Sequence, residues 1–219
     1  MEPDAVEIRV LGCLIEKQRT TPDVYPLTLN ALRLACNQAT NRDPVVDYDE
    51  NTIRSGIERL VQRKWATLAS WSNRRSMKYR HTLDGALALD DAEISLLAVL
   101  MLRGPQTPGE LKTRTERLHA FASMKELMDA LGRLIERRLA VRLERRPGQR
   151  EERYAHLLGE DSDEAEERTT APAIAAPAEP VAAAPQPAAG DADERFRRIE
   201  QQIAELRAQL QALRDELGA

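Results

Sequence analysis

The feature that most constrains the fold is an internal repeat within the first 158 residues. Residues 49–64 and residues 123–138 share one apolar pattern at a constant separation of 74 positions. In both segments the apolar positions are spaced i, i+4, i+7 and i+8, which places them on one face of a helix. Each segment begins with a residue that caps helices well, Asp49 or Ser123. The apolar positions are Ile53, Ile57, Leu60 and Val61 in the first copy and Leu127, Leu131, Leu134 and Ile135 in the second.

The repeat continues on both sides of these two helices. Each helix is followed by two alternating segments around a polar turn, a pattern that predicts a β-hairpin. Each is preceded by an apolar helix, over residues 6–18 or 92–102, and by a helix start at Thr21-Pro22 or Thr107-Pro108. Three helices and a hairpin, present twice, are typical of winged helix-turn-helix domains.

The predicted fold is therefore mainly α with small β-hairpins (α+β), arranged as two tandem winged-helix domains over residues 1–88 and 89–158. The upstream helices of the two copies are 86 positions apart instead of 74, so the first copy carries 12 more residues. This insertion lies around Asn37–Asp47. Residues 159–194 form a linker, and residues 195–219 form a C-terminal helix.

The linker composition excludes a packed core. It begins with an acidic run, and residues 171–190 contain ten Ala and five Pro among 20 residues. Proline interrupts helices and sheets, alanine buries little apolar area, and the acids repel one another, so we expect disorder. The last 25 residues instead carry an apolar side chain every three or four positions, which predicts a coiled coil and a homo-oligomer. The alternative is a helix that folds back onto the body. The seam residues are Phe196, Ile199, Ile203, Leu206, Leu210, Leu213 and Leu217.

The net charge of −4 conceals an uneven distribution. Residues 1–90 carry a net charge of +1 and residues 91–158 carry +3, whereas residues 159–194 carry −9. The part of the chain that can fold is thus mildly basic, and the overall acidity does not exclude a negatively charged partner.

We expect a cytoplasmic protein without a membrane segment. The longest apolar run, around Leu96–Leu102, is too short to cross a bilayer. The first ten residues lack the basic and apolar regions of a signal peptide. The two cysteines, Cys13 and Cys36, form no CxxC pair and are expected to be buried thiols on separate apolar helix faces.

Three long segments also resemble one known family. CLIEKQRTTPDVYPLTLNALRLACNQATNRDPV, LRGPQTPGELKTRTERLHAF and RPGQREERYAHLL occur in this order and are similar to the bacterial YceH family. The resemblance covers residues 4–158 and implies a tandem winged-helix fold, without assigning an activity. We expect the linker and the C-terminal helix to be additions to the part that this family shares.

The sequence offers little for an enzyme, a cofactor or a metal. The histidines are far apart, and His81 and His156 occupy equivalent hairpin positions, where packing is the simpler explanation. No Cys/His spacing for zinc, glycine-rich phosphate loop or nucleophile motif is present. We therefore predict a binding protein that needs no catalytic residues, no cofactor and no metal.

Nucleic acid is the partner that the polar faces favour. In winged-helix proteins the third helix enters the major groove, while the hairpin contacts the backbone. Arginine can bridge guanine edges or neutralise phosphates. We accordingly predict a DNA-binding transcriptional regulator. Its candidate contact residues are Asn51, Arg54, Arg59, Arg63, Arg74, Arg75, Lys78, Arg133, Arg137, Arg145, Arg146 and Arg150.

The alternative is a protein-interaction scaffold, in which the tandem winged helices grip a partner protein. Glu58 and Glu136 lie on the two third helices, and the basic surplus is modest for a DNA-binding protein. A cluster of amides between Asn30 and Arg42 also has two interpretations. It either forms a polar site at the end of the second helix or braces the following loop, and we favour bracing because asparagine readily caps turns.

Overall fold

The computed structural model describes residues 2–69, 77–145 and 151–159. Its first half contains three main helices and a three-stranded sheet. The elements are α1 (Ala5–Thr20), a short 3-10 turn (Pro22–Val24), β1 (Leu27–Thr28), α2 (Leu29–Cys36), α3 (Glu50–Gln62), β2 (Ala66–Ala69) and β3 (Lys78–His81).

The second half repeats this order after a short connecting helix, α4 (Leu83–Leu87). The expected boundary between residues 88 and 89 falls between α4 and the next helix, and this division into domains stays a prediction. The elements are α5 (Asp91–Arg103), α6 (Pro108–Thr115), α7 (Met124–Glu136), β4 (Ala140–Leu143) and β5 (Arg153–His156). We call the two sets, from α1 to β3 and from α5 to β5, the first and second repeats.

The hairpins of the two repeats are joined to the rest of the fold in the same way. In the first repeat, β1 pairs antiparallel with β3, and Leu27 lies opposite Tyr79. In the second repeat, Gln106 and Tyr154 form a single bridge, with N–O distances of 2.9 and 2.8 Å in the two directions. Each bridge connects the segment before the second helix to the second strand of the hairpin, so the hairpin cannot swing freely.

Both repeats begin with a helix that has a capping box. In α1, the Asp4 side chain accepts a hydrogen bond from the backbone N–H of Glu7 at 2.8 Å, and the Glu7 carboxylate accepts one from the N–H of Asp4. Asp90 and Glu93 form the same reciprocal pair at the start of α5. The boxes satisfy backbone donors that the first turn of a helix leaves free.

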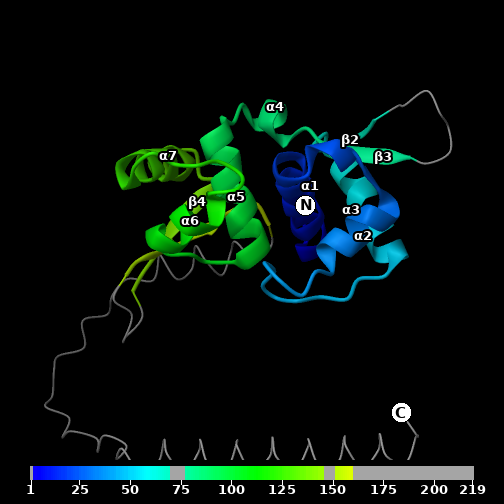
Figure 1. Cartoon of the computed structure of the whole chain (residues 1–219), viewed down its shortest axis with the longest axis horizontal. Coiled ribbons are helices and arrows are strands. Elements are labelled where there is room, and N and C mark those ends of the chain that lie inside the picture. Colours follow the sequence, from blue (N-terminus) through cyan, green and yellow to red (C-terminus); the bar gives the residue numbers. More distant parts are fainter. Residues whose placement is uncertain (1, 70–76, 146–150, 160–219) are drawn as a thin grey trace, which may run out of the picture. The chain divides into compact units, whose positions relative to one another are not determined.

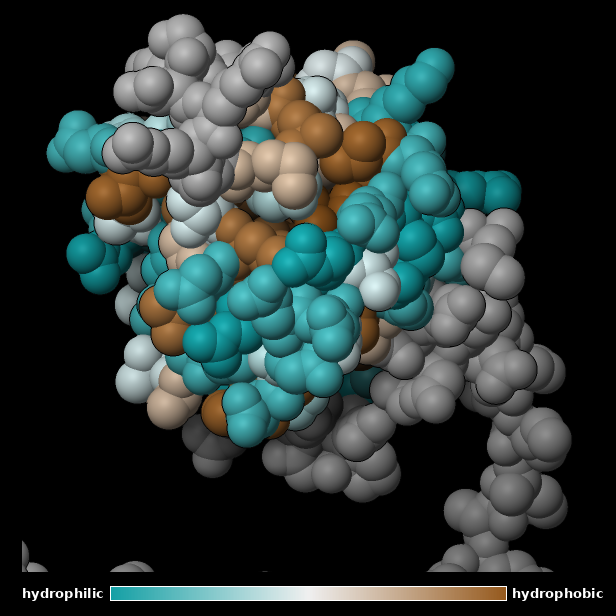
Figure 2. Space-filling model, turned by 90° about the vertical axis from the view of Figure 1, so that its right-hand side faces the viewer, coloured by the Kyte–Doolittle hydropathy of each residue, from teal (hydrophilic) through white to brown (hydrophobic). Residues whose placement is uncertain are grey.

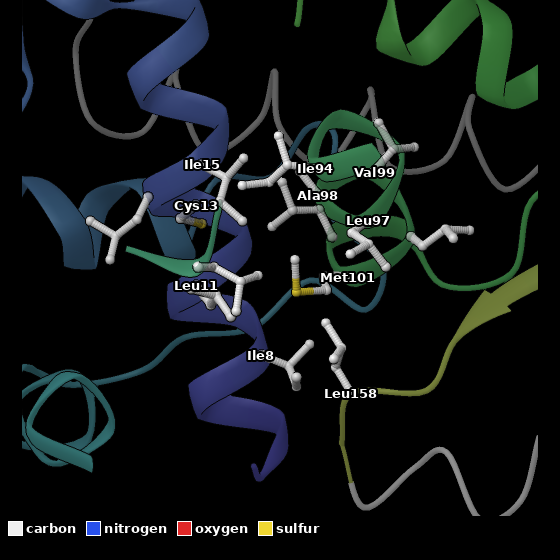
Figure 3. Close-up of a cluster of buried hydrophobic side chains, with 14 of the residues drawn as sticks. Ile8, Leu11, Cys13, Ile15, Ile94, Leu97, Ala98, Val99, Met101 and Leu158 are labelled. Carbon is white, nitrogen blue, oxygen red and sulfur yellow. The ribbon is translucent and has the colours of Figure 1, made fainter. Parts of the chain in front are cut away.

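The core of the described chain lies between the repeats as well as within them. Helices α1 and α5 pack side by side, and α2, α3 and the first hairpin lie on the other side of α1 from α5 (Figure 1). Side chains such as Leu11, Ile15, Ala98 and Met101 fill the space between the two helices (Figure 3). A Cβ on Gly12 would lie 2.9 Å from Cγ of Leu102, so the backbone approaches α5 closely here because position 12 is glycine.

The prediction of helices with small antiparallel hairpins is confirmed. The linker and the coiled-coil seam, residues 160–219, lie outside the described residues, and both stay predictions. Within the described ranges, no helix is long and apolar enough to cross a membrane.

Candidate macromolecule-binding surfaces

The capping box of α1 also holds the C-terminal end of α3. The Glu7 carboxylate lies 2.8 Å from Nε of Arg63 and 3.1 Å from Nε of Arg59. Arg59 reaches Asp4 through Nη2, and Arg63 donates to the carbonyl of Glu2 at 2.9 Å. One turn of α1 is therefore fastened to one turn of α3 by a network of charge-assisted hydrogen bonds.

The second repeat contains the same network. Arg133 Nε lies 3.2 Å from the Glu93 carboxylate, and its Nη2 lies 2.7 Å from Asp90. Arg137 lies 3.5 Å from Glu93 and donates to the carbonyls of Leu87 and Ala88. We call the Asp4–Glu7–Arg59–Arg63 set and its Asp90–Glu93–Arg133–Arg137 counterpart the two Arg–Glu clamps.

The electrostatics of the clamps fit an internal role. The Glu7 side chain is 2% exposed and that of Glu93 is 5% exposed. Burial opposes ionisation of Glu7, but hydrogen bonds from Arg63 and Arg59 outweigh it and lower the pKa of the carboxyl. A buried carboxylate needs its cationic partners, so these arginines serve the fold. Four residues predicted from the sequence to contact nucleic acid therefore form ion pairs within the fold, while their side chains stay 25–45% exposed. They are Arg59, Arg63, Arg133 and Arg137.

Four of the remaining predicted residues lie within the described ranges. Asn51 is exposed at the start of α3, and Arg54 forms an exposed i,i+4 ion pair with Glu50 at 2.6 Å. Lys78 is half-buried in β3, and Arg145 lies 3.5 Å from Glu152 at the end of the second hairpin. Arg74, Arg75, Arg146 and Arg150 lie outside the described residues.

The exposed surfaces of the two third helices differ along one stripe of positions beside the outward face. The outward face of α3 is polar, with Asn51, Ser55, Glu58 and Gln62 all exposed. On α7, three apolar side chains are 36–40% exposed and lie on one stripe of the helix. The stripe occupies the positions equivalent to Glu50, Arg54 and Val61 of α3, and the polar contact faces predicted from the sequence for both helices did not include it. The stripe consists of Met124, Met128 and Ile135.

The first repeat also exposes apolar side chains near its polar face. The view toward α2, α3 and β2–β3 shows a mainly hydrophilic surface interrupted by apolar patches (Figure 2). Leu34, Leu68 and Met77 are each about half exposed or more. Scattered exposure of this kind is ordinary on a folded protein, so these side chains alone define no site.

The amide-rich segment after α2 braces its own loop, as the sequence favours. Asn37 donates to the carbonyl of Tyr48 at 2.8 Å and accepts from its N–H at 2.9 Å. Arg42 is buried, binds the Glu16 carboxylate at 2.6 and 3.1 Å, and donates to the carbonyl of Ala35. The segment therefore folds against the ends of α1 and α2 through satisfied polar groups.

The cysteines are free and buried, as predicted, but they are neighbours. Burial opposes ionisation of Cys13, yet a hydrogen bond with Cys36 and the charge of Arg42 lower the pKa of its thiol. The same hydrogen bond and burial raise the pKa of Cys36. They lie on the buried faces of separate helices, α1 and α2, as expected, and the two helices pack with these faces together.

Of the two equivalent histidines, His81 is a packing residue of the first hairpin, whereas His156 is half-buried. His81 is buried; its N–H donates to the Tyr25 hydroxyl at 2.8 Å, and its ring contacts Gln18. Burial lowers the pKa of His81 to about 4, so it is neutral at physiological pH. Among the described residues, no group of three or more His, Cys, Asp or Glu side chains could hold a metal ion.

The sequence of the chain is similar to one group of bacterial proteins. A family model described as "Protein of unknown function, DUF480" matches residues 4–149. A UPF0502 protein of Geobacter sulfurreducens is 51% identical over 170 residues, which are 76% of this chain and 77% of that protein. A UPF0502 protein of Azotobacter vinelandii is 51% identical over 160 residues, or 73% and 71% of the two chains.

A third relative bears on the C-terminal segment. The UPF0502 protein YceH of Salmonella paratyphi B is 41% identical over 224 aligned positions, covering 99% of this chain and 98% of that protein. An alignment of this extent includes the residues after 158. The expectation that the linker and the last helix are additions to the family is therefore wrong.

Proposed function

The chain belongs to the bacterial family of proteins of unknown function described as DUF480, and we propose that it is a non-enzymatic DNA-binding regulator with two winged-helix domains. The contact surface in this proposal is the outward face of α3 together with the β2–β3 hairpin. The second repeat contributes mainly by holding the first in place. The observation that carries the proposal is the polar outward face of α3, which the Arg–Glu clamp leaves free.

The order of the elements supports the winged-helix assignment. Each repeat has three helices followed by a two-stranded hairpin, and each hairpin is tied to the segment before the second helix. This is the order in which winged-helix domains present a third helix and a wing. The Arg–Glu clamps fix the third helix against the first, so its outward face is held in a constant orientation.

The chemistry of that face supports contact with DNA. Asn51 and Gln62 can each hydrogen-bond a base edge in two ways, and Ser55 can bond a base or a phosphate. Among the described residues, Arg54 pairs with Glu50 in an exposed ion pair, which contributes little and can be exchanged for a phosphate. In β3, the exposed Arg80 supplies a cation on the hairpin.

Binding to duplex DNA tests the proposal directly. We expect the intact protein to bind a fluorescein-labelled random duplex at about 50 mM salt, with an affinity that falls steeply as salt rises. Combining Arg54→Ala with Arg80→Ala removes two cations and should lower the affinity about tenfold or more on every sequence. The matched control is Lys125→Ala on α7, where the lysine side chain is 85% exposed and lies at the position equivalent to Asn51. It should bind like the wild type.

Two results would count against DNA binding by this face. One is an affinity that is absent or independent of salt. The other is an equal loss in the α3 variant and in the Lys125→Ala control, which would assign any attraction to overall charge. Circular dichroism of each variant separates a loss of binding from a loss of folding.

A second function, contact with a partner protein, is favoured by the apolar stripe on α7. Lys125 and Asp129 pair with each other beside the stripe at 2.9 Å, so the face carries little net charge. Partly exposed methionines adapt to different partner surfaces. Met128→Glu should abolish capture of a specific cellular protein without altering DNA affinity, whereas Lys125→Glu should preserve capture. Unchanged capture by Met128→Glu would contradict this second function.

A further inference from the structure

A groove at the junction of the two repeats has a chemistry that neither proposed function uses. Its volume is about 660 Å³, within the range of small-molecule sites. The C-terminal ends of α1 and α5, the loop after α2, and the end of α6 with the residues that follow it form its walls. We call it the inter-repeat groove. Its polar lining residues include Lys17, Gln38, Asn41, Arg103, Arg114 and Arg117.

Cations outnumber carboxylates along this groove. Lys17, Arg103, Arg114 and Arg117 line it, whereas Glu16 is the single carboxylate among its lining residues. The Glu16 carboxylate is already bound by the buried Arg42 at 2.6 Å and lies 3.2 Å from Nζ of Lys17. The negative charge of Glu16 is thus already paired and does not neutralise the three lining arginines.

The arginines of the groove differ in the partners that their guanidinium groups contact. Arg114 pairs with Glu110 at 3.2 Å, outside the lining. Arg103 has a neutral partner, the side-chain oxygen of Asn41. Arg117 has no ion pair with any residue in the ranges 2–69, 77–145 and 151–159. Two guanidinium groups in one concave site therefore have no carboxylate of their own.

Arg103 is partly buried beside other cations. Burial, followed by the charges of Arg114 and Arg42, lowers the pKa of its guanidinium, and the acids Glu16 and Glu110 counter this only in part. Charged groups that are partly desolvated without a counter-charge destabilise a fold. A bound anion with several charges would relieve this repulsion and use donors that are already in place.

We propose that the inter-repeat groove binds a small phosphorylated metabolite, with Arg103 and Arg117 as its principal phosphate ligands. Arginine presents a planar fork that matches phosphate oxygens, and several arginines at one site favour an anion with more than one charge. The volume and the walls contributed by both repeats suit a compact ligand rather than an extended nucleic-acid strand. Thr40 supplies a further hydroxyl donor at the groove, whereas the hydroxyls of Thr20 and Thr113 already donate to backbone carbonyls.

Binding at this place has a structural consequence. The ligand would touch α1 and the loop of the first repeat together with α5 and α6 of the second. It would therefore stabilise the association of the repeats and raise the melting temperature of the whole described body. This effect is independent of DNA, so the site can be tested whether or not α3 binds a duplex.

The experiment uses the full chain and inorganic pyrophosphate as the probe. Isothermal titration at low ionic strength should show binding to the wild type, and a thermal scan should show a higher melting temperature at saturating pyrophosphate. Arg117→Gln should weaken binding about tenfold or more because it removes a charge-assisted hydrogen bond. Arg117 is exposed and forms no ion pair with the described residues, so this variant should keep the fold. Arg103→Gln should weaken binding at least as much.

The matched control is Arg138→Gln, which removes an exposed arginine outside the groove. It should bind pyrophosphate like the wild type. Equal affinity of Arg117→Gln, Arg103→Gln and Arg138→Gln would overturn the proposal, as would no binding by the wild type at about 10 mM pyrophosphate, a concentration at which even millimolar affinity is detected. Citrate serves as a second probe. Tighter binding of citrate than of pyrophosphate would overturn the assignment to phosphate.

Discussion

Replacing Glu7 by glutamine should show that the Arg–Glu clamp holds the fold together. The substitution preserves the shape of the side chain but removes the charge that binds Arg59 and Arg63 at 3.1 and 2.8 Å. Hydrogen bonds to charged groups contribute roughly 1.5–3 kcal/mol each. The two arginine side chains are 36% and 25% exposed, so they recover part of their hydration when the carboxylate is lost. We therefore expect the free energy of unfolding to fall by about 2–3 kcal/mol in total.

The assay is urea denaturation at pH 7, followed by far-ultraviolet circular dichroism. A loss of this size corresponds to a melting temperature lower by about 5–10 °C for a body of this length. Glu50→Gln is the matched control, because it removes the same charge from an exposed i,i+4 pair with Arg54. That pair should contribute less than about 1 kcal/mol even with its place near a helix start. If Glu7→Gln and Glu50→Gln lose the same amount, the reasoning about the clamp is refuted.

The clamp also predicts a pH dependence. The folded state lowers the pKa of Glu7 below its usual value of 4.5. A carboxyl of this kind stabilises the fold fully above its usual pKa, and the stabilisation is lost as the pH falls through the lower, folded-state value. The difference in stability between the wild type and Glu7→Gln should therefore shrink from pH 7 to about pH 3. A constant difference across that interval would show that the lost energy is not electrostatic.

Three further predictions concern other parts of the chain. Gly12→Ala should destabilise by roughly 1–3 kcal/mol because its Cβ would lie 2.9 Å from Leu102, whereas Gly132→Ala, which meets nothing within 4 Å, should stabilise by about 0.5–1 kcal/mol in the same denaturation assay. His81 should titrate near pH 4 by NMR, and stability should be complete above about pH 6.5 and fall as the pH drops toward 4; an ordinary titration near 6.5 would contradict its burial. Deleting residues 191–219 should halve the mass measured by light scattering, and an unchanged mass would exclude a dimer built on that segment.

The repeat made the order of elements predictable because helix and hairpin patterns are local properties of a sequence. The spacing of Ile53 and Ile57 fixes which face of α3 is buried, and the alternation before Tyr79 and Tyr154 predicts the hairpins. The pairing of Leu27 with Tyr79 was not predictable from these patterns, since two residues of strand have no period of their own. It depends on contacts between segments that are far apart in sequence.

The partners of the arginines on the third helices could not be predicted from local patterns. Helical spacing places Arg59 and Arg63 away from the apolar face, but it does not say whether solvent or another helix lies there. Their partner Glu7 is more than 50 positions away. A signal was nevertheless present, because both repeats combine an Asp-x-x-Glu start of the first helix with an Arg-x-x-x-Arg end of the third. Complementary charges that recur together in both copies indicate an internal pair.

The close packing of α1 against α5 fixes the separation of the third helices of the two repeats. The distance between α3 and α7 is set by a buried seam, at which Gly12 meets Leu102, and not by the length of a flexible connection. A partner that touches both helices must match one fixed spacing. Substitutions in this seam would therefore change the spacing that is recognised without altering a single contact residue. Buried residues between α1 and α5 would then affect partner binding, although none of them is exposed on the surface.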